Sequence, residues 1–297
     1  MIKRSLISVS VASLSLLAFL FAGPAADAQR HGLTADVTLN QPVFLPGEDL
    51  LVNVRIVNHS GQSLALGEGQ DWITFSIAGP GNVEVATKGS MPVAKPFTLP
   101  SGDMANVKFN PAPFYDLSQP GRYTIKATVK VAQWDQKFVC AQIVFTVERG
   151  APLSDFPGLE FGMATDAGVT NAIPETRRYD LLKVTSQDEI KLYFRLSGPN
   201  GKVLRCYSVG RMLSFSVPEA KMDRFNNLHL LWQYSARDFS YLVITTSGDL
   251  LLRETHVYTE TRPHLKASER NIVSVHGGVR KYTPWDIPSV VSESANK

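Results

Sequence analysis

Three residues near the C-terminal end of the chain have the types and spacing of a metal-binding or acid–base group. His256, Glu260 and His264 follow one another at every fourth position, which would place them on one face of an α-helix. Imidazole nitrogens and a carboxylate are ligands that Zn²⁺ takes in catalytic sites. One hypothesis for this chain is therefore a metal-dependent hydrolase that uses these three residues.

The surrounding residues favour a strand over a helix. The segment 257–261 is rich in β-branched and aromatic residues, and Pro263 follows it. Because strand side chains alternate between two faces, His256, Tyr258 and Glu260 would share one face. We therefore prefer a polar sheet face with binding potential, and we expect no metal, no cofactor and no catalytic residue.

Trp134 is a further candidate for a contact residue. It lies in the segment 132–136, between two stretches in which apolar and polar residues alternate, so we expect it at the tip of a hairpin. An exposed aromatic ring there could contact a protein or stack on a sugar. The candidate binding residues are thus Trp134, Tyr258, His256 and Glu260.

Other patterns of catalytic or metal-binding residues are missing. The sequence lacks a P-loop, GxGxxG, HExxH and an EF-hand loop. It also lacks the GxSxG elbow that His276-Gly277-Gly278 would need to act as an oxyanion loop, so we interpret those glycines as a turn between strands. His229 is expected to be a packed histidine inside a strand.

Two cysteines, Cys140 and Cys206, are the only ones in the chain. They lack the close spacing of a zinc site. Each falls within an alternating apolar stretch, which favours buried free thiols. A disulfide between them is the alternative that an oxidising compartment would permit.

Residues 1–28 have the layout of a secretory signal peptide. Lys3 and Arg4 precede an apolar run over 6–21, and Ala26-Asp27-Ala28 has the A-x-A form of a cleavage site. The run is shorter than the roughly 20 residues that span a bilayer. We expect cleavage after Ala28, export to the periplasm or the extracellular space, and no membrane span in the mature chain. The formal net charge of +3 gives no reason to expect a nucleic-acid partner.

The region 29–149 must position Trp134. Its sequence predicts a succession of β-strands separated by turns. Apolar and polar residues alternate with period two, and Pro, Gly, Asn and Ser mark turns between the runs. Such a pattern favours an antiparallel β-sandwich. We expect strands near 35–39, 50–57, 73–77, 83–86, 104–109, 123–131 and 139–147.

Two short sequence motifs in this region resemble those of a known class of domains. The first is 44–48 (FLPGE), which leads into the strand-like stretch 52–58, and the second is 115–123, which contains Pro-Gly before Tyr123. Together they resemble bacterial immunoglobulin-like and macroglobulin-like domains of surface and periplasmic proteins. The resemblance implies an immunoglobulin-like sandwich over 29–149. It also implies that the Tyr123 hydroxyl ties the loop before its strand back to itself.

The region 150–285 must position the histidines, and it contains an internal repeat. Segment 188–197 aligns without gaps on 226–235, about 38 residues later, and a fainter copy begins at Asn271. The units resemble blades of sialidase-type β-propellers, but a closed propeller needs about four or more blades. We favour a second all-β domain of meanders, as a second sandwich or open sheet, over a partial propeller. Residues 286–297 are expected to be a disordered tail.

Taken together, these patterns predict an exported two-domain, all-β protein without catalytic activity. We expect a binding, adaptor or scaffold protein that acts through contacts with a protein of the cell envelope or the extracellular space. The alternatives are a carbohydrate-binding or propeller-like recognition protein, and the hydrolase described above.

Overall fold

The computed structural model describes residues 32–69, 71–91, 95–163, 175–186 and 188–287. The predicted signal peptide lies outside these residues. The described chain is all-β, as the sequence predicts, and its helical pieces are short 3₁₀ turns. Within it, no helix is long and apolar enough to cross a membrane.

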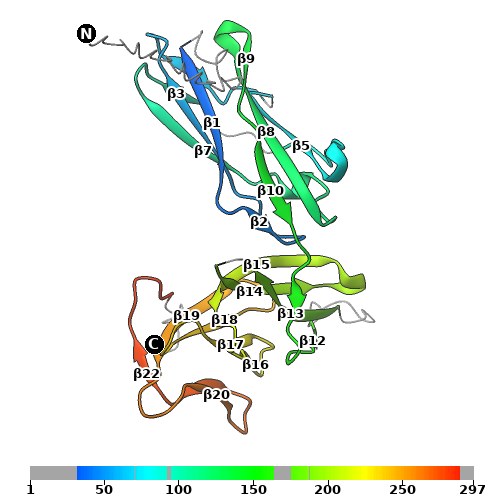
Figure 1. Cartoon of the computed structure of the whole chain (residues 1–297), viewed down its shortest axis with the longest axis vertical. Helices are drawn as coiled ribbons and strands as arrows, with labels where there is room; N and C mark the ends of the chain where they lie inside the picture. Colours follow the sequence, from blue (N-terminus) through cyan, green and yellow to red (C-terminus); the bar gives the residue numbers. More distant parts are fainter. Residues whose placement is uncertain (1–31, 70, 92–94, 164–174, 187, 288–297) are drawn as a thin grey trace, which may run out of the picture.

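The strands before residue 150 form two main sheets around one apolar cluster (Figure 1). Inward side chains alternate with outward ones along each strand, as in the buried Val52, Val54 and Ile56. The first sheet has the order β1-β3-β7, and the second has the order β2-β10-β8-β5 with β9 also paired to β8. A small pair, β4-β6, completes this half. The bounds are β1 Leu33–Leu39, β2 Val43–Phe44, β3 Val52–Asn58, β4 Leu64–Leu66, β5 Ile73–Ala78, β6 Phe97–Leu99, β7 Met104–Phe109, β8 Gly121–Val131, β9 Gln136–Val139 and β10 Ile143–Val147.

Two expected strands of this half differ from the structure. The stretch 83–86 makes only an isolated bridge between Ala78 and Glu84. The stretch 139–147 is divided into β9 and β10, which both pair with β8 but with registers that differ by one position. The interruption at 140–142 is thus a bulge in one long hairpin, which a period-two pattern does not reveal.

The tyrosine singled out in the sequence makes the expected bond. The Tyr123 hydroxyl donates to the carbonyl oxygen of Gln119 at 2.7 Å. Its ring is buried and stacks on Phe145, with ring centroids 5.4 Å apart. The bond closes the turn that leads into β8.

The strands after residue 150 form two further sheets and a hairpin. One sheet has the order β11-β13-β14-β15 with β12 paired to β13, and the other has the order β16-β17-β18-β19-β22. The hairpin β20-β21 pairs with neither sheet, but it packs against the sheet of β17 and β18 through a further apolar cluster. The bounds are β11 Ala151–Pro152, β12 Leu159–Gly162, β13 Thr176–Thr185, β14 Ile190–Ser197, β15 Val203–Met212, β16 Glu219–Met222, β17 Leu228–Gln233, β18 Asp238–Ile244, β19 Leu250–Val257, β20 His264–Ala267, β21 Val273–His276 and β22 Val279–Lys281.

The two sheets pack face to face through one apolar cluster. The repeat explains this packing, because Leu192 and Phe194 of β14 align with Leu230 and Trp232 of β17, and all four lie in the cluster. Trp232 is buried, as expected of a core residue, and its indole N–H donates to the Arg211 carbonyl at 2.9 Å. From the sequence we favoured meanders as a second sandwich or an open sheet, and the structure has the facing pair.

A separate apolar cluster joins the two halves. Leu45, from the loop after β2, packs with Leu182, Tyr193 and Cys206 of the sheet that contains β14. Gly47 is needed there: its φ is +84°, and a Cβ would come within 2.5 Å of the Val203 side chain. The closeness of β2 to β15 is visible at the junction (Figure 1).

Candidate binding surface

The strand β22 forms one edge of its sheet and is followed by a loop that leaves the sheet and returns to it. Lys281 lies opposite Thr255 of β19, so continued pairing would bring residue 283 opposite Arg253. Ile287 lies there instead. The segment 282–286 is therefore looped out of the edge strand, and we call it the aromatic loop.

Hydrogen bonds hold the aromatic loop in shape. The Thr283 hydroxyl donates to one carboxylate oxygen of Asp286 at 2.8 Å, and the Thr283 backbone N–H donates to the other at 3.3 Å. The Asp286 N–H donates in return to the Thr283 carbonyl at 3.1 Å. Two backbone bonds between Arg253 and Ile287, of 3.0 and 3.1 Å, close the loop on β19.

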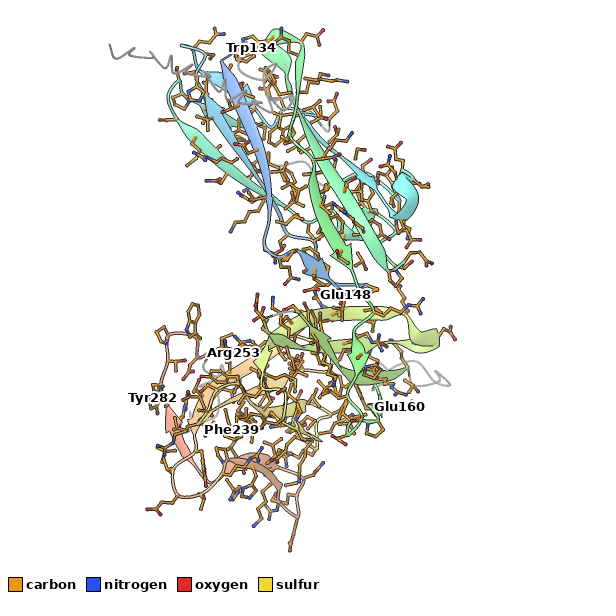
Figure 2. The ribbon with its side chains drawn as sticks, in the orientation of Figure 1. Trp134, Glu148, Glu160, Phe239, Arg253 and Tyr282 are labelled. Carbon is orange, nitrogen blue, oxygen red and sulfur yellow. The ribbon has the colours of Figure 1, made fainter. Side chains whose placement is uncertain are left out.

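Two aromatic side chains project from this loop into solvent. Tyr282 is 79% exposed and Trp285 is 75% exposed, although residues of this size are usually well buried. Val279, before these rings in the sequence, and Ile287, after them, are also exposed. Figure 2 shows Tyr282 on the outer side of β22, away from the body of the sheet.

Arg280 connects the loop to the sheet face behind it. Its guanidinium contacts Glu254 at 3.0 Å and Asp286 at 4.0 Å, and it lies 4.5 Å from the centre of the Tyr282 ring. Glu254 in turn contacts the His256 ring nitrogen at 3.2 Å. These contacts fix the base of the loop against β19.

Deeper on the same sheet face, a chain of polar groups is buried. His229 Nδ1 lies 2.6 Å from the Tyr241 hydroxyl, and its Nε2 lies 3.3 Å from an Asp223 carboxylate oxygen. Because a carboxylate only accepts, Nε2–H donates to Asp223 and Nδ1 accepts from Tyr241. Burial lowers the pKa of His229 and raises that of Tyr241. The packed, satisfied histidine expected from the sequence is confirmed.

The predicted group His256, Glu260 and His264 is distributed over different elements. His256 is buried on β19, Glu260 is exposed beyond the end of that strand, and His264 is exposed at the start of β20. Tyr258 follows β19 and is also exposed. Among the described residues no group of three or more His, Cys, Asp or Glu side chains is placed to hold a metal.

Trp134 lies at the tip of the β8–β9 hairpin, as expected. Its ring is half-buried, because it packs edge-on against Phe138 with centroids 6.0 Å apart. Ser60, Gln62 and Gln136 line a shallow hollow beside it. Figure 2 places Trp134 at the far end of the first half, well away from Tyr282.

Sequence reasoning did not single out Tyr282 or Trp285 as candidate contact residues. They stand at the boundary that we drew between the second domain and its tail, where no period-two pattern remains. The signal that could have identified the loop is Thr283-x-x-Asp286, since such side chains cap turns by bonding to nearby backbone. Asp286 and Ile287 belong to this bonded segment, whereas 288–297 lie outside the described residues.

At the junction between the halves, Glu48 is a buried acid. Its carboxylate accepts hydrogen bonds from the Gln41 side chain at 2.7 Å and from the Leu45 N–H at 2.9 Å. Burial outweighs these bonds and raises the pKa of Glu48 to about 7. A cleft beside this junction is lined by the apolar Leu45, Pro46, Pro152 and Leu182 together with Ser118, Gly150, Arg149 and Arg195.

Both cysteines are free and buried. Cys140 lies in the apolar cluster of the first half, and Cys206 lies at the junction. Burial raises the pKa of the Cys140 thiol to about 11 and that of the Cys206 thiol to about 12. Both are therefore protonated and unreactive near neutral pH.

Comparisons with known proteins add little to this picture. No family model matches the chain, and no curated protein matches it. Two of the solved structures that match illustrate how weak the likeness is. A sporulation control protein from Bacillus subtilis, Spo0M, is 12% identical with a TM-score of 0.29, over 56% of this chain and 79% of its own. The YadV chaperone is 8% identical with a TM-score of 0.23, over 73% of this chain and 96% of its own.

Proposed function

We propose that this protein is an exported binding protein, without catalytic activity, that recognises a protein partner through the aromatic loop and the edge of β22. The observation that carries the proposal is the pair of exposed rings, Tyr282 and Trp285, on a loop that the protein itself holds rigid.

Rigid aromatic side chains are effective anchors at protein interfaces. Tyr and Trp are enriched among the residues that contribute most to binding, and they lose little conformational entropy when they are already fixed. The bonds between Thr283 and Asp286, and the contact of Arg280 with Tyr282, hold this loop before any partner arrives.

The neighbouring strand favours a protein partner over a sugar. Among the described strands, none pairs with the outer side of β22. Such an edge offers backbone N–H and C=O groups to an added strand, and the flanking side chains then select which strand binds. A sugar would use the rings but would leave the backbone edge unused.

Affinity capture with matched variants tests the proposal. The full mature chain is used as bait on the envelope and secreted fractions of the cells that produce it, beside Y282A/W285A and the control W134A. We expect a partner that the wild type and W134A retain and that Y282A/W285A loses. Equal capture by all three proteins would contradict the proposal.

A glycan array separates the carbohydrate alternative. Binding of a glycan that is lost in Y282A/W285A, with no protein captured, would assign the same loop to sugar recognition and would overturn the choice of a protein partner.

A further inference from the structure

We infer that His264 and His276 form a two-imidazole site for a divalent transition-metal ion of the class that prefers nitrogen ligands, such as Zn²⁺. The inference does not depend on the proposed function. It uses one histidine of the group predicted from the sequence but gives it a different partner.

The hairpin places the two histidines directly opposite each other. β20 and β21 pair antiparallel, with His264 opposite His276 and Leu265 opposite Val275. Leu265 and Val275 pack into the apolar cluster under the hairpin. A shift by one residue would turn those side chains to solvent, so burial fixes this register. Both histidines consequently stand on the exposed face as direct neighbours.

The ring of His264 is held in the tautomer that suits a metal ligand. Its Nδ1 lies 3.3 Å from the Arg262 carbonyl oxygen. A carbonyl only accepts, so Nδ1 carries the proton and Nε2 keeps its lone pair. Metal-binding histidines commonly donate their second ring nitrogen to a backbone carbonyl in this way.

The backbone around that carbonyl is also constrained. Gly277 has a φ of +75°, and a Cβ there would come within 2.6 Å of the Arg262 carbonyl oxygen. The Gly278 N–H donates to the Thr261 carbonyl at 3.0 Å. Only glycine permits this close approach, which holds the segment before His264 against the end of β21.

The separation of the two rings suits a shared metal ion. Their centroids are 6.1 Å apart and the ring planes are inclined by 38°. Metal–nitrogen bonds are about 2.0–2.1 Å long. Two imidazole centroids on one metal ion then lie about 5.2 Å apart when the nitrogen–metal–nitrogen angle is tetrahedral, and about 6.4 Å apart when the nitrogens lie on opposite sides of the metal. The rings are therefore within range, and a small rotation of either exposed side chain completes the tetrahedral arrangement.

The residues around the two imidazoles leave the space between the rings free and the coordination of the metal ion incomplete. The Arg262 guanidinium lies over the Phe239 ring, 5.3 Å from its centre, and therefore does not occupy the space between the imidazoles. His276 has no hydrogen bond or ion pair with any described residue. With two protein ligands, the remaining coordination positions stay open to water or to a side chain from another molecule.

Zn²⁺ titration of the full mature chain tests the site. Calorimetry at about pH 7.5 should give one ion per chain for the wild type, and H264A and H276A should each weaken binding by about tenfold or more. H59A, which removes an exposed histidine of the first half, should bind as the wild type does.

The metal-free variants provide the structural check. Because both side chains are exposed, H264A and H276A should melt at the wild-type temperature without Zn²⁺ and should lose only the rise in melting temperature that Zn²⁺ gives the wild type. Absence of Zn²⁺ binding by the wild type, or binding that persists in H264A/H276A, would overturn the inference.

Discussion

The two halves of this molecule both pack sheets around an apolar cluster, but they differ in the side chains that they bury and expose. In the described part of the first half, Asn58 and the junction residue Glu48 are the buried polar side chains, whereas the second half buries Ser197, Ser216, His229, Thr255 and His256. The large exposed side chains differ in the same way: aliphatic in the first half, but including Phe215, Phe225, Tyr258, Tyr282 and Trp285 in the second. Packed sheets alone do not require this asymmetry. This asymmetry supports our proposal that the second half carries the recognition surface.

The largest expected effect is on the stability of the first half. Asn58 is fully buried; its side-chain N–H groups donate to the carbonyls of Gln62 and Leu99 at 2.8 and 2.9 Å, and its oxygen accepts from Ser60. Asn58→Ala leaves buried groups unpaired, so we expect the free energy of unfolding to fall by about 3–4 kcal/mol.

Denaturant unfolding measures this loss, with Asn53→Ala as the control. The Asn53 side chain makes only long bonds of 3.5 and 3.4 Å. An equally small loss in both variants would show that the first half is not held by this buried residue.

The next effect concerns the junction between the halves. The folded-state pKa of Glu48 is raised to about 7 from 4.5. The folded state therefore favours the protonated acid, and its contribution to stability is complete below pH 4.5 and is lost as the pH rises through 7. Ionisation should destabilise by roughly 3 kcal/mol at most.

Glu48→Gln removes this titration, so its stability should change less with pH over the same interval than that of the wild type. Lys191 and Asp49, the charged groups that act on Glu48, remain in place in this variant. Parallel pH profiles for E48Q and the wild type, from denaturant unfolding at a series of pH values, would contradict the assignment.

A smaller effect of opposite sign is expected in the second half. Burial lowers the pKa of His229, so the unfolded state takes up its proton first and stability falls as the pH drops below about 6.5.

Tyr241→Phe removes the hydrogen bond to His229 Nδ1 and should cost about 1–2 kcal/mol at neutral pH. Tyr282→Phe, an exposed tyrosine, is the control for thermal or denaturant unfolding. A loss in Y282F as large as that in Y241F would refute the claim that this polar chain stabilises the sheet.

The smallest effect on stability is expected at the aromatic loop. Tyr282 and Trp285 are mostly exposed, so Y282A/W285A should change the free energy of unfolding by about 0.5 kcal/mol or less. A thermal melt measures this directly. A large loss would mean that the rings serve the fold and would remove the main argument for a binding loop.

Much of the fold could be predicted from residue patterns. Strands such as 104–109 and 123–131 alternate cleanly, because one face packs on the apolar cluster and the other faces outward. The repeat predicted two similar meanders, and Phe194 and Trp232 occupy equivalent core positions in them; whether they form a sandwich or an open sheet was left open. The two-residue strand β2 and the bulge at 140–142 were not predictable, because neither leaves a periodic signal.

The candidate site was harder to predict for a physical reason. His256, Glu260 and His264 are close in sequence, yet β19 ends at Val257 and the chain turns before β20. The neighbours of His264 and Tyr282 are set by pairing with other segments: β21 in one case, and β19, which Ile287 bridges at Arg253, in the other. Spacing along one segment carries no information about such contacts.

Site-specific photocrosslinking tests the central claim most directly. A photoreactive residue replaces Trp285, and in a second protein it replaces Trp134, in cells that produce the chain. The aromatic-loop account predicts a discrete crosslinked partner from position 285 and none from position 134. A partner crosslinked only from position 134 would contradict it and would place recognition on the first half.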